Sequence, residues 1–159
     1  MKPDTASDTS QPAQVSDDRL RGLLGYRLRR ASNAVQADLA ETLKPFDLRM
    51  ITYTALVLVV DNPGLSQSQL AAAMDVERPN LVVIVDELER RELITRDRVP
   101  TDRRTYALNA TLAGRRLCDQ AESAVRQHEA RIFGTLLEEE RSLLARGLLH
   151  VIAQRTGES

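Results

Sequence analysis

The residues with the clearest potential for chemistry are Arg78 and Asn80, in the first turn of a helix predicted over residues 78–91. An arginine guanidinium donates two hydrogen bonds to O6 and N7 of guanine, and an asparagine amide pairs with N6 and N7 of adenine. Further along, Val82 or Val83 would either contact a thymine methyl group or belong to the core. This edge therefore predicts base recognition in double-stranded DNA, with ordinary exposed polar residues as the alternative.

Three further cations, Arg98, Arg103 and Arg104, lie in a Pro-containing turn between two short strand-like runs, residues 93–95 and 105–108. Arginine forks pair with phosphate oxygens and fit a narrow minor groove. We therefore expect a basic hairpin that contacts DNA, and a solvated hairpin is the alternative.

Ser66, Gln67 and Ser68 stand at the start of a short predicted helix that continues to Ala73. Serine is a favoured N-cap residue, which suits Ser66. The free N–H groups at a helix start also bind phosphate oxygens. The three residues therefore predict a contact with the DNA backbone or capping alone.

Secondary-structure elements must position these side chains relative to one another. The chain reads as a short helix, a break at Asp75-Val76, a second helix and a basic hairpin, which is the layout of a winged helix-turn-helix. In this layout the second helix enters the major groove, and the hairpin lies beside the backbone or minor groove. An apolar helix over residues 48–60 is predicted to be central.

Both ends of the chain are also predicted to be helical, so the fold class is mainly α. Ser16-Asp17-Asp18 starts a helix that ends near Leu43, and two more helices run over residues 112–137 and 138–155. Their apolar faces exceed what one small domain buries. We therefore expect a homodimer in which these helices form a bundle and hold two recognition helices about one turn of DNA apart.

The charge is distributed unevenly. The whole chain has a net charge of -1, but residues 78–116 hold nine arginines against six acidic residues, a balance of +3. This local balance favours a nucleic-acid partner despite the overall charge. The aromatic content of 3%, with no Trp, argues against a stacking platform for single strands.

Other kinds of chemistry lack the residues that they need. The single cysteine, Cys118, excludes an internal disulfide, and the isolated His128 and His150 predict no metal site. No catalytic constellation or glycine-rich phosphate loop is present in the sequence, so we expect neither an enzyme nor a cofactor. Residues 1–16 are polar and predict a disordered tail without a secretory signal. Because the longest apolar run, residues 55–60, is too short to span a membrane, we expect a cytoplasmic protein.

The order and spacing of these segments resembles the MarR (multiple antibiotic resistance regulator) family of bacterial transcription factors, over about Leu20 to Ile152. The most specific match is Asp102-Arg103-Arg104 in the hairpin, at its distance from the helix-turn-helix. The other matching segments are residues 24–30, 46–48, 63–71 and 85–94, with Thr111 and Gly114.

The resemblance implies a single chain over residues 17–159. Its dimerisation helices would cover residues 17–45 and 112–155, and its winged helix-turn-helix residues 46–110. It further implies that Asp102 pairs with one of the two adjacent arginines while the other contacts DNA.

The resemblance also implies a small-molecule pocket between the dimerisation helices and the winged domain, because many members bind aromatic acids there and release DNA. An arginine facing such a cavity would pair with a carboxylate. The alternative is that the tyrosines are core residues and the arginines lie on the surface. The candidate lining residues are Tyr26, Arg27, Arg30, Met50, Tyr53 and Thr54.

The chain departs from the family pattern at the recognition helix. Glu92 stands where the family usually has glycine, and Pro79-Asn80 and Val83 replace the usual Ser-Thr and basic residue. We therefore expect an unusual operator, bound mostly through the hairpin and phosphate contacts. Some members sense oxidants through a cysteine near the first helix. Cys118 lies elsewhere, so we expect a plain buried or half-buried cysteine, with a redox sensor as the alternative.

The sequence thus predicts a ligand-responsive repressor that leaves a pseudo-palindromic operator when a small effector binds, such as an aromatic acid or thioester. The alternative is a protein-interaction module that uses a winged-helix scaffold without specific DNA binding. The apolar run over residues 82–85 leaves that alternative open.

Overall fold

The computed structural model describes residues 15–99 and 102–156, and it divides between Ala34 and Val35 into two compact units. Within this range the side chains of residues 99, 102–105 and 155–156 are outside the description. The predicted tail over residues 1–16 therefore lies almost entirely outside the described residues.

The first unit contains α1 (Asp18–Arg21) and the first part of α2 (Leu24–Leu43). The sequence predicted one continuous helix here, which is wrong, because the helix is interrupted at Gly22 and Leu23. Glycine weakens a helix by roughly 0.5–1 kcal/mol relative to alanine, which explains where the break occurs. Four leucines of this unit are between 44% and 81% exposed, namely Leu20, Leu23, Leu24 and Leu28.

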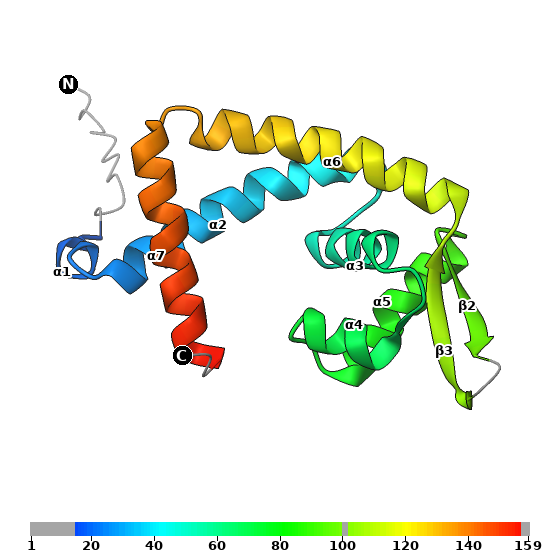
Figure 1. Cartoon of the computed structure of the whole chain (residues 1–159). Coiled ribbons are helices and arrows are strands. Elements are labelled where there is room, and N and C mark those ends of the chain that lie inside the picture. The colour runs from blue at the N-terminus through cyan, green and yellow to red at the C-terminus, as the bar shows by residue number, and fades with distance from the viewer. Residues whose placement is uncertain (1–14, 100–101, 157–159) are drawn as a thin grey trace, which may run out of the picture. The chain divides into compact units, whose positions relative to one another are not determined.

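The second unit continues α2 and contains the helix-turn-helix (Figure 1). The recognition helix, predicted over residues 78–91, is α5 (Arg78–Arg90), and the break before it contains Asp75 with a left-handed φ of 50°. The other elements, in order, are η1 (Lys44–Phe46), α3 (Met50–Asp61), β1 (Leu65–Ser66), α4 (Gln67–Ala73), β2 (Ile94–Val99), β3 (Asp102–Ala110), α6 (Leu112–Phe133) and α7 (Glu138–Thr156).

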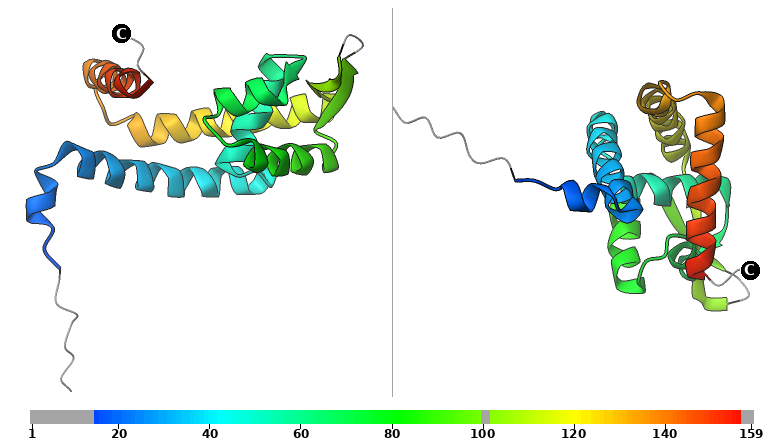
Figure 2. Two further views of the ribbon diagram at one scale, coloured as in Figure 1. Left: turned by 90° about the horizontal axis from the view of Figure 1, so that it is seen from below. Right: turned by 90° about the vertical axis from the view of Figure 1, so that its left-hand side faces the viewer.

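The described strands form one antiparallel sheet in the order β1-β3-β2, and β2 and β3 make the wing at the edge of the helices (Figure 2). Both predicted strands were too short, since β2 extends to Val99 and β3 begins at Asp102. β1 was missed altogether. Its pairing of Leu65 with Leu108 closes the sheet against the helix-turn-helix.

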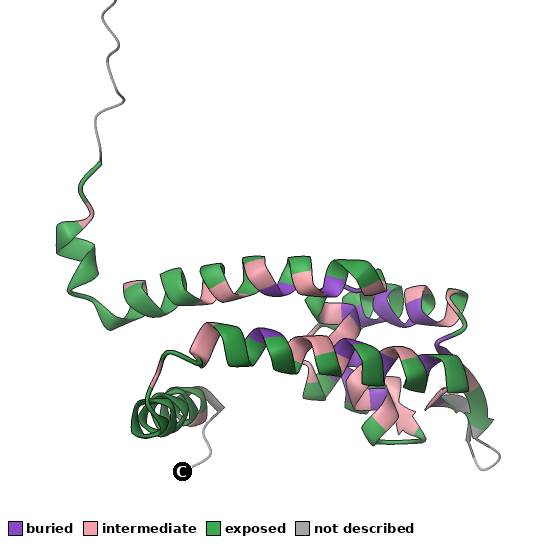
Figure 3. Ribbon diagram, turned by 90° about the horizontal axis from the view of Figure 1, so that it is seen from above, coloured by how far each residue is buried: buried purple, intermediate pink, exposed green. Residues whose placement is uncertain are grey.

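The core of the second unit gathers where α3, α5, α6 and the sheet meet (Figure 3). α3 is central, as its composition predicted, because Ala55, Leu56 and Val59 are fully buried. At Gly114, α6 lies very close to the backbone of Leu93, the residue just before β2. A Cβ at this glycine would lie 2.0 Å from the carbonyl oxygen of Leu93, so only glycine fits there.

α6 begins where it was predicted, at a cap in which Thr111 Oγ1 accepts a hydrogen bond of 3.0 Å from the Gly114 N–H. α7 presents its described residues almost entirely to solvent (Figure 3). Its apolar side chains are between 37% and 64% exposed, namely Leu143, Leu144, Leu148, Leu149, Val151 and Ile152. None of the helices in the described range is long and apolar enough to cross a membrane.

Candidate functional site

The recognition helix α5 has one buried and one exposed face. Its core face consists of Leu81, Ile84, Val85 and Leu88, whereas Arg78, Asn80, Val82 and Val83 are exposed. Val82 is 43% and Val83 64% exposed, so neither belongs to the core, although the sequence left that open. Packing in the core therefore holds the predicted reading edge outward.

The start of α5 is tied to α4 through one hydrogen bond. Arg78 Nη2 donates to Ser68 Oγ over 2.8 Å, so two of the predicted DNA-contacting residues lie side by side. Ser66 acts as a cap, because its Oγ accepts from the Gln69 N–H at 3.2 Å and donates to Gln69 Oε1 at 2.8 Å. Gln67 is half-buried, and a role for these residues toward phosphate stays a prediction.

The wing is fixed to the recognition helix by Arg96, a residue that sequence reasoning missed. Arg96 Nη1 lies 2.9 Å from Glu89 Oε2, and Nη2 pairs with Asp86. The Arg96 side chain is only 21% exposed, and its Nε is buried without a hydrogen-bond partner within the described structure. These two ion pairs orient the base of the wing relative to α5.

Of the three predicted wing arginines, the structure describes the side chain of Arg98 alone. Arg98 is exposed near the end of β2, next to a register shift between Arg98 and Val99. Arg103 and Arg104 belong to the backbone of β3, but their side chains lie outside the described residues, as does that of Asp102. The expected pairing of Asp102 with an adjacent arginine therefore stays a prediction.

The other side of α5 is bonded to the segment that joins α2 to α3. Arg91 donates through Nη2 to the Phe46 carbonyl oxygen at 3.0 Å and through Nη1 to the Asp47 carbonyl oxygen at 2.5 Å. One turn earlier, Glu87 Oε2 lies 2.5 Å from Arg49 Nη2. Contacts on both sides thus set the position of the recognition helix.

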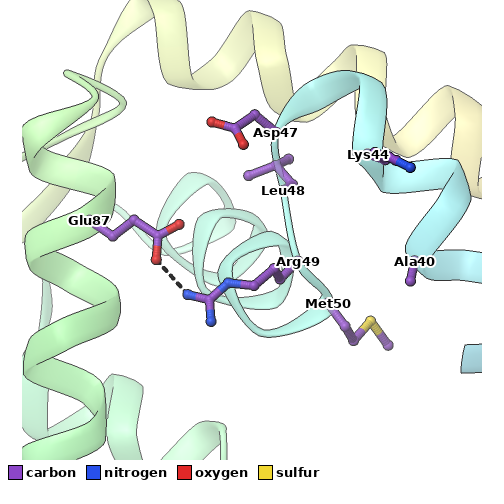
Figure 4. A pocket seen from close by; sticks show the side chains of 7 residues that line it. All are labelled: Ala40, Lys44, Asp47, Leu48, Arg49, Met50 and Glu87. Atoms are coloured by element: carbon purple, nitrogen blue, oxygen red, sulfur yellow. Dashed lines mark hydrogen bonds and ion pairs between the residues drawn. The ribbon is translucent and has the colours of Figure 1, made fainter. Parts of the chain in front are cut away.

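A pocket of about 330 Å³ opens beside the Arg49–Glu87 pair (Figure 4). It combines two cations, Lys44 and Arg49, with two acids, Asp47 and Glu87. The remaining lining residues are Ala40, Leu48 and Met50. An acidic ligand in this pocket would compete with Glu87 for Arg49, because both bind the same guanidinium.

The six predicted ligand-binding residues are divided between the two units, and their role as ligand contacts stays a prediction. Tyr26, Arg27 and Arg30 line a pocket of about 420 Å³ in the first unit, together with Arg21. Met50 lines the pocket beside Glu87 in the second unit. Tyr53 and Thr54 line neither. Tyr53 packs against a small cluster around Leu39, and Thr54 Oγ1 donates to the Met50 carbonyl oxygen at 2.9 Å.

Burial raises the pKa of two side chains, Cys118 and Tyr53. Cys118 is 4% exposed, and desolvation raises the pKa of its thiol to about 11. Desolvation likewise raises the pKa of Tyr53. A protonated, buried thiol is a poor nucleophile, which agrees with the expectation of a plain buried cysteine.

The two histidines, which we expected not to bind metal, lie in different environments. His128 is buried with Nε2 3.1 Å from Asp38 Oδ2, and Arg131 pairs with the same carboxylate. His150 is exposed on α7. Within the described residues no group of three or more metal-binding side chains is found.

Comparison with known proteins places these features in a family. Residues 46–105 match the family model described as "MarR family". Over 151 residues the chain is 36% identical to the "Putative transcriptional regulatory protein for hcr operon" of Thauera aromatica, covering 94% of this chain and 90% of that protein.

Solved structures give the same result. The transcriptional repressor CouR, bound to a 23-mer DNA duplex, matches with a TM-score of 0.83 at 33% identity, covering 88% of this chain and 99% of that chain. CouR from Rhodococcus jostii RHA1, bound to p-coumaroyl-CoA, matches with a TM-score of 0.76 at 32% identity, covering 85% of this chain and 95% of that chain.

Proposed function

The chain belongs to the MarR family of transcriptional regulators, and on that premise we propose that it is a cytoplasmic repressor released from its operator by a small aromatic acid or thioester. The observation that carries the proposal is the exposed edge of α5, with Arg78 bonded to Ser68 beside it. The likeness to DNA-bound CouR supports it. Membership of this family of transcriptional regulators supports a non-catalytic role.

In this proposal Arg78 and Asn80 read base edges, Val83 contacts a thymine methyl group, and the wing arginines bind the backbone and minor groove. Arg78 is already oriented by Ser68, so binding costs it little additional side-chain order. The three wing residues are Arg98, Arg103 and Arg104. Together with the phosphate contacts they supply most of the affinity, because the reading edge has few polar groups.

The operator is proposed to be pseudo-palindromic because the protein acts as a homodimer. The exposed leucines of α1 and the start of α2 in the first unit, and those of α7 in the second unit, are each apolar surface that a second copy would cover. A two-fold dimer then presents two copies of α5 to two half-sites.

We propose that the protein is released from DNA when a ligand binds in the pocket beside Glu87. A ligand that pairs with Arg49 takes this cation from Glu87 and so weakens one of the contacts that position α5. The ligand shifts the equilibrium only by its differential affinity for the two arrangements. The thioester bound to CouR supports an effector of this class.

A fluorescence-anisotropy titration on the DNA upstream of the chain's own coding sequence tests DNA binding. We expect a specific complex whose affinity falls steeply with salt, and a weaker one for Arg98→Ala with unchanged folding. A docking module of the alternative kind would give no sequence preference and no steep salt slope, which would refute the proposal.

A second titration tests the effector. Adding p-coumaroyl-CoA or salicylate should release the wild-type protein from DNA. Glu87→Gln, which has no charge for Arg49 to neutralise, should release less readily at the same ligand occupancy. Equal release from both proteins would show that the pair does not transmit the signal.

A further inference from the structure

The first unit holds a carboxylate surrounded by cationic and phenolic donors. Asp17 Oδ2 accepts a hydrogen bond of 2.6 Å from the Tyr26 hydroxyl and one of 2.9 Å from Arg30 Nη1. Its Oδ1 accepts a bond of 2.5 Å from Arg21 Nε. Although Asp17 is the N-cap residue of α1, its side chain makes no capping bond, so the carboxylate serves these three donors instead.

The donors belong to the pocket of about 420 Å³ that Arg21, Tyr26, Arg27 and Arg30 line. Asp17 is only 18% exposed at its side chain, whereas Arg21 and Arg30 are 63% and 59% exposed. The hydrogen bond from Tyr26, followed by that from Arg21, lowers the pKa of Asp17 to about 2. The carboxylate is therefore a full negative charge throughout the physiological pH range.

The single negative charge of Asp17 does not balance the positive charge of the arginines around it. Residues 15–34 contain five arginines and two aspartates, which leaves a net charge of +3. Arg27 donates from Nε to the Arg21 carbonyl oxygen at 2.5 Å, and within the described range no carboxylate pairs with it. The Arg29 guanidinium lies over the Tyr26 ring, 5.3 Å from its centre. A phosphate monoester, with two charges and three oxygens, fits this donor set better than one carboxylate.

We propose that this pocket binds a phosphate group of a small-molecule ligand and that Asp17 occupies the position of that phosphate when no ligand is present. The incoming phosphate takes the hydrogen bonds from Arg21, Tyr26 and Arg30, and the Asp17 carboxylate is released into water. Identifying the ligand as a coenzyme A thioester rests on the proposed function, whereas the phosphate site itself does not.

Isothermal titration calorimetry with adenosine 3′,5′-bisphosphate, at fixed ionic strength and without DNA, tests the site. Asp17→Asn should bind the probe about tenfold more tightly than the wild type, because the competing charge is gone. Arg30→Gln should bind about tenfold more weakly. Circular dichroism shows that each variant is folded.

Asp18→Asn is the matched control, because it removes the same charge at the neighbouring position. Among the described residues, the Asp18 carboxylate accepts a hydrogen bond only from the Ser16 hydroxyl. Equal tightening in Asp17→Asn and Asp18→Asn would mean general charge attraction and would overturn the proposal, as would no tightening in Asp17→Asn. A drop of about one in the salt slope of operator binding by Arg30→Gln would assign the cluster to the DNA backbone and would also overturn it. Failure of operator binding in all the proteins, with tight probe binding retained, would instead refute the proposed function alone.

Discussion

Replacing Arg96 by methionine removes the ion pairs between the wing and the recognition helix while keeping most of the side-chain volume. Arg96 joins β2 to α5 through Asp86 and Glu89, and these carboxylates lie one turn apart on the same helix. The substitution removes both ion pairs and leaves two like charges as neighbours. We expect it to lower both stability and operator affinity, although Arg96 itself faces α5.

The size of the stability loss follows from exposure. Asp86 and Glu89 are 55% and 40% exposed at their side chains, so each pair with Arg96 is worth at most about 1 kcal/mol. Repulsion between the two unpaired acids adds roughly 0.2–0.5 kcal/mol. Removing the buried Arg96 Nε, which lacks a hydrogen-bond partner within the described structure, offsets part of this loss of stability. The net loss is about 1–2 kcal/mol, or a fall in Tm of roughly 2–8 °C at fixed protein concentration.

Two measurements separate a positioning role from direct DNA contact. Urea unfolding of Arg96→Met, Asp86→Asn and the double variant gives the coupling energy of the pair. Anisotropy titrations over a range of salt concentrations should give a higher Kd with an unchanged salt slope. A slope lower by about 0.9 would mean that Arg96 binds a phosphate. Wild-type stability in Arg96→Met would refute the argument from the ion pairs.

Three further predictions concern stability and reactivity. Gly114→Ala forces a Cβ against the Leu93 carbonyl group and should cost at least about 2 kcal/mol in thermal unfolding; an unchanged Tm would contradict this contact. Glu92→Gly relieves a left-handed φ of 56° and should raise stability by about 1 kcal/mol, whereas a lower Tm would mean that the Glu92 side chain is needed. Cys118, with its pKa raised to about 11, should react with a thiol reagent at pH 7 only after unfolding, and rapid reaction of the native protein would exclude the burial described above.

The helices were predictable because each carries its own signal in the sequence. α5 keeps its apolar residues at Leu81, Ile84, Val85 and Leu88, which fall on one face at the period of 3.6 residues. Ser66 and Thr111 are local caps, and local bonds of this kind can be anticipated from a few adjacent residues. The interruption at Gly22 was not anticipated, because the same glycine would be tolerated in a helix supported by packing.

The strands were less predictable because pairing, and not side-chain type, determines where they end. Residues 96–99, three of them charged, look like a turn in the sequence, yet they pair with β3. β1 has two residues and no pattern of its own, so only its pairing with Ala107 and Leu108 of β3 defines it.

The residue types of the candidate sites could be predicted from the sequence, but the contacts between residues far apart in the chain could not. Exposure of Arg78 and Asn80 followed from the helical period. The Arg49–Glu87 pair joins residues 38 positions apart, and Arg91 reaches Phe46 across 45 positions. Because the sequence does not specify which helix faces meet, it does not show that Tyr26 and Arg30 line one pocket and Met50 lines another.

The internal ion pairs change what the local charge of +3 means for DNA binding. Arg91 and Arg96 are occupied by contacts inside the protein, so fewer arginines face DNA than the sequence count suggests. The ion pairs of Arg96 also neutralise Asp86 and Glu89, two acids of α5 that would repel phosphate. Arg49 does this for Glu87 from outside the counted segment, and it is also the cation that an acidic effector would bind. Under the proposed function, an acidic effector in the pocket would therefore oppose DNA binding twice, since it would loosen α5 and expose a negative charge on the recognition helix.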